Sequence, residues 1–131
     1  MGRKEYLTDT NVVIYYLGSN LTAESEQFMD SVFEQTPYLT VINRIELLCS
    51  KSLNEYETNA MESFIRNCYI LDLDEDIVSE TIRIRKEFNL KLPDSIIAAT
   101  CMVNNLQLVT NNVRDFRKVS GLKISTVDCL A

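Results

Sequence analysis

The alternation of short apolar runs with longer segments of helical periodicity is the feature that most constrains this fold. Runs at residues 6–8, 37–40, 69–71, 106–110 and 122–125 have the length and residue types of strands. Between them, the sequence indicates helices over residues 12–17, 22–34, 41–50, 54–67, 74–89, 93–103 and 113–118. Strands that alternate with helices predict an α/β sandwich with a parallel sheet, because parallel neighbours need a helical crossover.

Length and composition limit both the organisation of the chain and its chemistry. With 131 residues, 46% of them hydrophobic, the chain is expected to form one globular domain over 1–131. It contains no His, so proton transfer would depend on carboxylates or on metal-bound water. Only three Gly residues and no Walker or dinucleotide motif exclude the glycine-rich phosphate loops. No stretch predicts a signal peptide or a membrane span, so we expect a cytoplasmic protein without a membrane partner.

The charge of the chain argues against a general nucleic-acid-binding surface. Thirteen Lys and Arg residues against nineteen Asp and Glu give a net charge of −6. A nucleic acid would therefore have to be held by a local basic patch or through metal ions.

Four carboxylates occupy places where an α/β fold positions ligands, at strand ends and at the starts of helices. Asp9 directly follows the first predicted strand, and Asp115 follows the strand at 106–110. Asp94 lies in the first turn of a helix too apolar to be a surface element, and Glu46 flanks an apolar helix stripe. Because ligands bind outside the carboxyl ends of parallel strands, we expect a common pocket there. Three polar residues are predicted to support it: Asn11, Thr110 and Asn112.

Each of these carboxylates also has a purely structural interpretation. Asp9 or Thr10 would serve as an N-cap, and Asp94 would suit the positive end of a helix dipole. Asp115 with Asn112 would form an approximate capping box. Glu46 would lie at the wet margin of its helix, two residues from Arg44. A side chain can cap a helix and bind a ligand at the same time, so these interpretations do not argue against a pocket at this edge.

The predicted pocket has the ligand chemistry of a hard divalent cation. Oxygen donors without imidazole or paired thiols favour Mg²⁺ or Mn²⁺. Such an ion lowers the pKa of an attacking water and neutralises charge on a phosphodiester. Metal-dependent phosphodiester hydrolysis is therefore the preferred chemistry.

Four motifs, in order along almost the whole chain, resemble the PIN domain and more narrowly the small bacterial VapC type of toxin ribonuclease. They are Leu-Thr-Asp-Thr-Asn at 7–11, Ile-Glu-Leu at 45–47, Leu-Pro-Asp-Ser-Ile-Ile-Ala-Ala at 92–99 and Leu-Val-Thr-Asn-Asn-Val-Arg-Asp-Phe at 108–116. The resemblance implies a three-layer α/β/α sandwich on a mainly parallel sheet of four to five short strands. It also implies an endoribonuclease that uses Mg²⁺ or Mn²⁺ at Asp9, Glu46, Asp94 and Asp115.

The resemblance further implies partners. Members of this family cleave RNA, often tRNA or ribosomal RNA, usually form homodimers, and are inhibited by a small cognate antitoxin. The acidic charge of this chain leaves its RNA-binding face undefined. Five basic residues near the motifs are candidates for phosphate contacts: Arg44, Lys91, Arg114, Arg117 and Lys118.

Two other classes of function remain as alternatives. A catalytically silent PIN-like module would act by binding protein or RNA, and its melting temperature would not respond to metal. A phospho-accepting, receiver-like domain also carries acids at strand ends, but its expected lysine after a late strand is not evident in this sequence.

Overall fold

A parallel five-stranded sheet forms the centre of the computed structural model, which describes residues 4–130. The strands are β1 (Tyr6–Thr8), β2 (Tyr38–Thr40), β3 (Tyr69–Leu71), β4 (Gln107–Thr110) and β5 (Ile124–Thr126). Their order is β3-β2-β1-β4-β5, and every neighbouring pair is parallel. The predicted α/β fold with a parallel sheet is therefore confirmed. Because β1 is central, the residue after it lies between the segments that follow β2 and β4.

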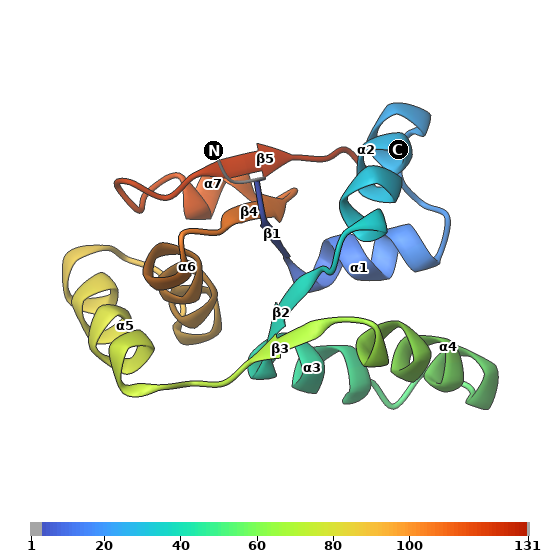
Figure 1. Ribbon diagram of the computed structural model, residues 1–131, viewed down its shortest axis with the longest axis horizontal. Helices are drawn as coiled ribbons and strands as arrows, with labels where there is room; N and C mark the ends of the chain where they lie inside the picture. The colour runs from blue at the N-terminus through green and yellow to red at the C-terminus, as the bar shows by residue number, and fades with distance from the viewer. Residues whose placement is uncertain (1–3, 131) are drawn as a thin grey trace.

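Helices cover both faces of this sheet and give the three layers seen in Figure 1. One layer contains α5 (Glu75–Glu87), α6 (Leu92–Asn104) and the short α7 (Val113–Phe116). The other contains α1 (Thr10–Leu17), α2 (Ala23–Glu34), α3 (Val41–Leu48) and α4 (Glu55–Arg66). The predicted segments match these helices, although α3, α5 and α7 each end two residues earlier than expected and α1 begins two residues earlier.

The two layers follow from the alternation of side chains along the strands. Leu7 and Leu108 are fully buried against the layer of α5, α6 and α7. Val109 and Leu39 are equally buried on the opposite face, against α1–α4. Successive strand residues point to opposite faces, so three-residue strands suffice to anchor both layers.

Helix α6 is the most deeply buried helix of the fold, as its composition predicts. Its residues from Ser95 to Cys101 are all buried. Pro93 lies in the first turn of the helix. A backbone N–H at that position would have no acceptor within the helix, so the lack of an N–H in proline costs no hydrogen bond there. Asn105 ends the helix in the left-handed conformation, with φ of 54°, and its N–H is bonded to the Cys101 carbonyl. The burial of α6 fixes the position of Asp94, which lies in its first turn.

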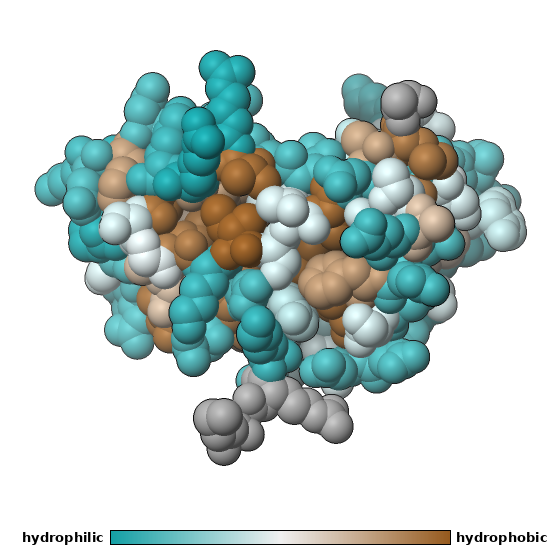
Figure 2. Space-filling view, turned by 90° about the horizontal axis from the view of Figure 1, so that it is seen from above, coloured by the Kyte–Doolittle hydropathy of each residue, from teal (hydrophilic) through white to brown (hydrophobic). Residues whose placement is uncertain are grey.

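The face of the molecule seen in Figure 2 carries no single continuous apolar area. In Figure 2, hydrophobic residues gather in two areas that are separated by residues of intermediate hydropathy and surrounded by hydrophilic ones. Within residues 4–130, no helix has both the length and the apolar character needed to cross a membrane.

Candidate active site

Asp9 occupies the centre of the carboxyl edge, directly after β1. The residue is buried and forms the N-cap of α1: its Oδ1 accepts from the Thr10 N–H at 2.9 Å. Its Oδ2 accepts from the Thr110 hydroxyl at 2.8 Å, across to the end of β4. Burial raises the pKa of Asp9, the two hydrogen bonds lower it, and the charge of Glu46 adds a smaller increase. The predicted capping role is confirmed, and it leaves further lone pairs on both oxygens.

Glu46 is connected to the same edge through Thr10, a residue whose contribution the sequence did not indicate. The Thr10 hydroxyl donates to Glu46 Oε1 at 2.7 Å and accepts from Asn43 Nδ2 at 2.9 Å. Asn43 is fully buried, and its Oδ1 accepts from the N–H and the hydroxyl of Thr40 at 2.8 and 2.9 Å. Glu46 is exposed, as expected for a residue at the solvent-facing margin of its helix. It is nevertheless connected to the site by the hydrogen bond from Thr10.

Asp94 shares one electrostatic environment with the other three carboxylates. Its pKa is raised to about 6, first by burial and then by the charges of Asp9, Glu46 and Asp115, while Lys91 lowers it. Asp94 is therefore electrostatically coupled to the other three carboxylates. Hydrogen bonds through Thr110 and Asn112 connect Asp9 with Asp115, and Thr10 connects Glu46 to the same edge. Asp94 does not cap α6, since that helix has no side-chain capping bond.

Asp115 is oriented by its neighbour Asn112 rather than by a capping box. Asn112 Nδ2 donates to Asp115 Oδ2 at 3.2 Å, and α7 has no side-chain capping bond. The Asn112 N–H donates to the Thr110 hydroxyl at 2.9 Å, which connects this segment to Asp9. The bond from Asn112 and the charges of Lys118 and Arg114 lower the pKa of Asp115, against a weaker opposing effect of desolvation.

The other predicted residues divide into two groups. Thr110 and Asn112 lie within the network that orients Asp9 and Asp115. Asn11, Arg44 and Arg114 are exposed, and in the described part of the chain none has a side-chain hydrogen bond or ion pair with the four carboxylates. Arg114 acts on the site only through its charge. Lys91, also exposed, lies at the N-cap of α6 and is considered below.

The donor set suits Mg²⁺ or Mn²⁺, although it is not a closed cage. Across residues 4–130, no three His, Cys, Asp or Glu side chains form a ready-made metal-binding group. Mg²⁺ is commonly held by one or two carboxylates and keeps several waters, so a closed cage is not required. All the converging donors are oxygens, and the repulsion that raises the pKa of Asp94 would be relieved by a cation. The residues therefore fit a hard divalent ion.

A larger hollow of different lining lies elsewhere in the described chain. It has a volume of about 570 Å³ and is lined by residues at the amino ends of β1 and β2, among them Tyr6, Tyr38 and two glutamates, Glu5 and Glu34. Among the residues of 4–130 that line it there is no Lys or Arg, which makes this hollow a poorer candidate for phosphate or RNA than the carboxyl edge. The carboxylate cluster remains the candidate active site.

Comparison with known proteins gives consistent results. The family model of the PIN domain matches residues 6–122. A protein of Salmonella typhimurium named tRNA(fMet)-specific endonuclease VapC is 29% identical over 128 residues, covering 92% of this chain and 96% of the relative. The protein of the same name from Shigella flexneri is 27% identical over 127 residues, covering 91% and 95%. A chain in the crystal structure of DNA-bound VapBC from Salmonella typhimurium superposes with a TM-score of 0.80 at 24% identity, covering 95% and 98%.

The family match extends over nearly all the described residues, and the fold agrees with that of the structural neighbour. The resemblance drawn from the four motifs is thus confirmed, and this chain belongs to the PIN domain family.

Proposed function

We propose that this protein is a metal-dependent endoribonuclease and the toxin component of a type II toxin–antitoxin pair. The observation that carries the proposal is the hydrogen-bond network at the carboxyl edge of the sheet, which connects Asp9 with Asp115 and Glu46. The electrostatic coupling of Asp94 to these three carboxylates supports it. Relatives of nearly the same length bear the name of a tRNA-specific endonuclease, which supports RNA as the substrate class. Whether the RNA is a tRNA or a ribosomal RNA is a matter for experiment.

The site residues divide the work of holding a Mg²⁺ or Mn²⁺ ion and the scissile phosphate. Asp9 and Asp94 would be the principal ligands, because Asp9 is fixed by two hydrogen bonds and Asp94 lies in the first turn of a buried helix. Glu46 and Asp115 complete the acidic rim and are held by Thr10 and Asn112. The bound ion supplies an activated water and neutralises phosphate charge, which replaces the histidine base that the sequence lacks.

The same proposal includes the biological setting. The structural neighbour comes from a VapBC complex, which supports a small cognate antitoxin as the partner of this chain. We further propose that residues 1–131 act as a single domain, that the protein forms a homodimer, and that it works in the cytoplasm.

Cleavage of RNA by the purified protein tests the proposal. The protein, freed of any antitoxin, is expected to cut a structured RNA in Mg²⁺ or Mn²⁺ and to lose this activity in chelator and in Asp94→Asn. Asp72→Asn is the matched control, because Asp72 is an exposed acid that follows β3 at the same edge of the sheet but takes no part in the cluster. Equal cutting by Asp94→Asn and Asp72→Asn would reject the proposed site, and binding of RNA without cutting would favour a silent module.

A further inference from the structure

A second hollow adjoins the carboxylate cluster and differs from it in charge. It has a volume of about 270 Å³, and it lies where the end of α5, the start of α6 and α7 meet. Its size is at the lower limit for ligand pockets, so it would hold part of a polymer rather than a whole small molecule. The lining consists of Arg85, Asn89, Leu90, Lys91, Asp115 and Lys118.

This hollow belongs to the most basic part of an acidic protein. Residues 83–91 and 114–118 together contain seven Lys and Arg and only two acids, a net charge of +5, whereas the whole chain carries −6. Asp115 lines the hollow and also belongs to the acidic cluster, so the basic and acidic regions share a border. An anion held in the hollow would therefore lie beside the proposed cleavage site.

The wall of the hollow is held in place before any ligand binds. Arg85 Nη1 donates to the Leu90 carbonyl at 2.6 Å, and Ser95 Oγ contacts the same carbonyl at 3.3 Å. Lys118 Nζ donates to the Asn89 carbonyl at 3.3 Å and lies 3.6 Å from Asp115 Oδ1. The segment between α5 and α6 is thus tied to both of these helices and to the residue after the C-cap of α7. A fixed wall lowers the entropy lost when a ligand is bound.

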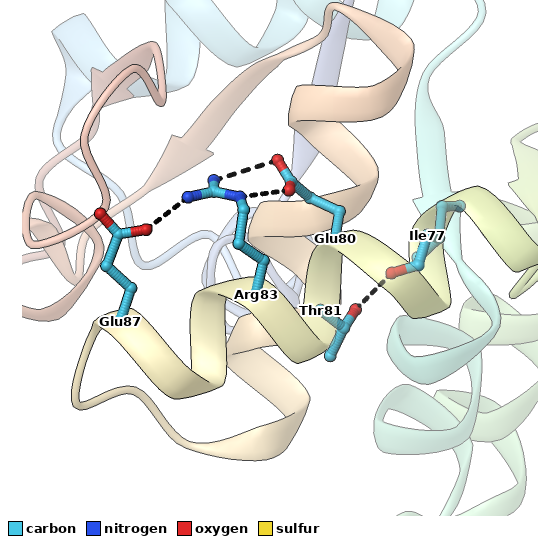
Figure 3. Close-up of polar contacts among 5 residues, drawn as sticks. All are labelled: Ile77, Glu80, Thr81, Arg83 and Glu87. Atoms are coloured by element: carbon cyan, nitrogen blue, oxygen red, sulfur yellow. Dashed lines mark hydrogen bonds and ion pairs between the residues drawn. The ribbon is translucent and has the colours of Figure 1, made fainter.

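The basic side chains of this region differ in whether they are already paired with an acid. Arg83 is paired with Glu80 and Glu87, each at 2.6 Å, as Figure 3 shows. Arg85 and Lys91 form no ion pair with any acid of residues 4–130. Lys91 is exposed and begins α6, whose first turn lacks a side-chain cap. The charge of Lys91 acts on Asp94 without forming an ion pair with it, so the ammonium group, which lines the hollow at the start of a helix, is suited to a phosphate.

We propose that this hollow binds a backbone phosphate of the RNA that neighbours the scissile one, with Lys91 as its principal cation. Arg85 and Lys118 hold the loop that forms the wall, and they add positive potential. The inference rests on the proposed function and extends it, because it assigns the path of the RNA to the side of α5, α6 and α7. It also explains how a chain of net negative charge can hold RNA beside an acidic cluster.

Lys91→Gln and Lys86→Gln form a matched pair for the test. Both lysines are exposed and lie in the same basic segment, but Lys86 does not line the hollow. Binding of a single-stranded RNA oligonucleotide is measured in chelator at several salt concentrations. Lys91→Gln is expected to bind roughly two- to fivefold more weakly than Lys86→Gln. Its plot of log affinity against log salt should be shallower by about 0.7, the value for one phosphate contact on a single strand.

Cleavage then locates the phosphate. In an RNA with a mapped cleavage site, the phosphates near that site are replaced one at a time by a neutral methylphosphonate. One position next to the scissile phosphate should raise KM for Lys86→Gln and have little further effect on Lys91→Gln, because both changes remove the same contact.

The outcomes separate this inference from the proposed function. Equal RNA affinity and equal salt dependence of the two variants would overturn the inference, even if the protein cuts RNA. Absence of cutting by the unaltered protein would reject the proposed function, while the binding experiment in chelator would still decide whether the hollow holds phosphate.

Discussion

Asp94 combines two requirements that oppose each other in the metal-free protein. Its carboxylate must be ionised to hold a cation, yet burial and three neighbouring carboxylates disfavour that charge. The folded protein therefore stores repulsion at this residue in the absence of metal. Asp115 is in the opposite condition, because the bond from Asn112 and nearby cations stabilise its charged form.

This conflict predicts how the stability of the metal-free protein depends on pH. The pKa of Asp94 is about 6 in the folded state against 3.8 ordinarily, so the folded state binds the proton more tightly. Stability is then lost as pH rises from about 4 to about 6, by well under about 3 kcal/mol because solvent screens this half-buried group, and is constant above that. Urea unfolding in chelator should show Asp94→Asn to be more stable than the unaltered chain at pH 7 and equal to it near pH 4.

Groups that Asp94 does not affect titrate equally in the unaltered chain and in Asp94→Asn. Their contributions therefore cancel when the free energies of unfolding of the two proteins are subtracted. Asp72→Asn serves as the control and should show no such pH-dependent gain, because Asp72 is exposed and lies outside the cluster. A gain in Asp94→Asn that stays the same from pH 4 to pH 7 would contradict the assigned environment.

Helices α1 and α3 are coupled at the site by the buried chain of hydrogen bonds from Asn43 through Thr10 to Glu46. Thr10→Val preserves the shape of the side chain but removes the donor to Glu46 and the acceptor for the buried Asn43 amide. An unsatisfied buried amide costs about 1–3 kcal/mol, so the free energy of unfolding should fall by that amount. Chemical denaturation measures it, with Thr36→Val, at an exposed position, expected to change stability by less than about 0.5 kcal/mol. A Thr10→Val protein as stable as this control would show that the bonds are not maintained.

The elements could be predicted from the sequence more completely than the contacts between them. Apolar periodicity and capping residues such as Asp74 lie within single segments, so they located all five strands and all seven helices to within a few residues. The strand-end rule likewise drew attention to Asp9 and Asp115. The roles of Thr10 and Asn43 depend on how α1 packs on α3, which no local pattern encodes. Asn112 bonds to Asp115 rather than completing a capping box, because its backbone is not in the extended conformation typical of N-caps.

At the scale of the whole molecule, strand order determines where the charges meet. Because β1 is between β2 and β4, one edge of the sheet brings together residues separated by about a hundred positions, such as Asp9 and Thr110. The acids lie near the centre of that edge, and the basic segments lie to the side of α5 and α7. Such a separation allows the protein to attract both a cation and a polyanion to adjacent places.

Metal binding should therefore stabilise the whole fold through this one edge. A ligand that binds only the folded state at a hundred times its Kd adds about 2.7 kcal/mol, which for a chain of this size raises Tm by on the order of 10 °C. Mg²⁺ or Mn²⁺ should produce this rise in the unaltered protein and in Asp72→Asn, and chelator should reverse it. NaCl of equal ionic strength controls for screening. The rise should be smaller at pH 5 than at pH 7, because protons then compete for Asp94. Asp94→Asn should lose most of it, and an equal rise in that variant would mean that the ion binds away from the four carboxylates.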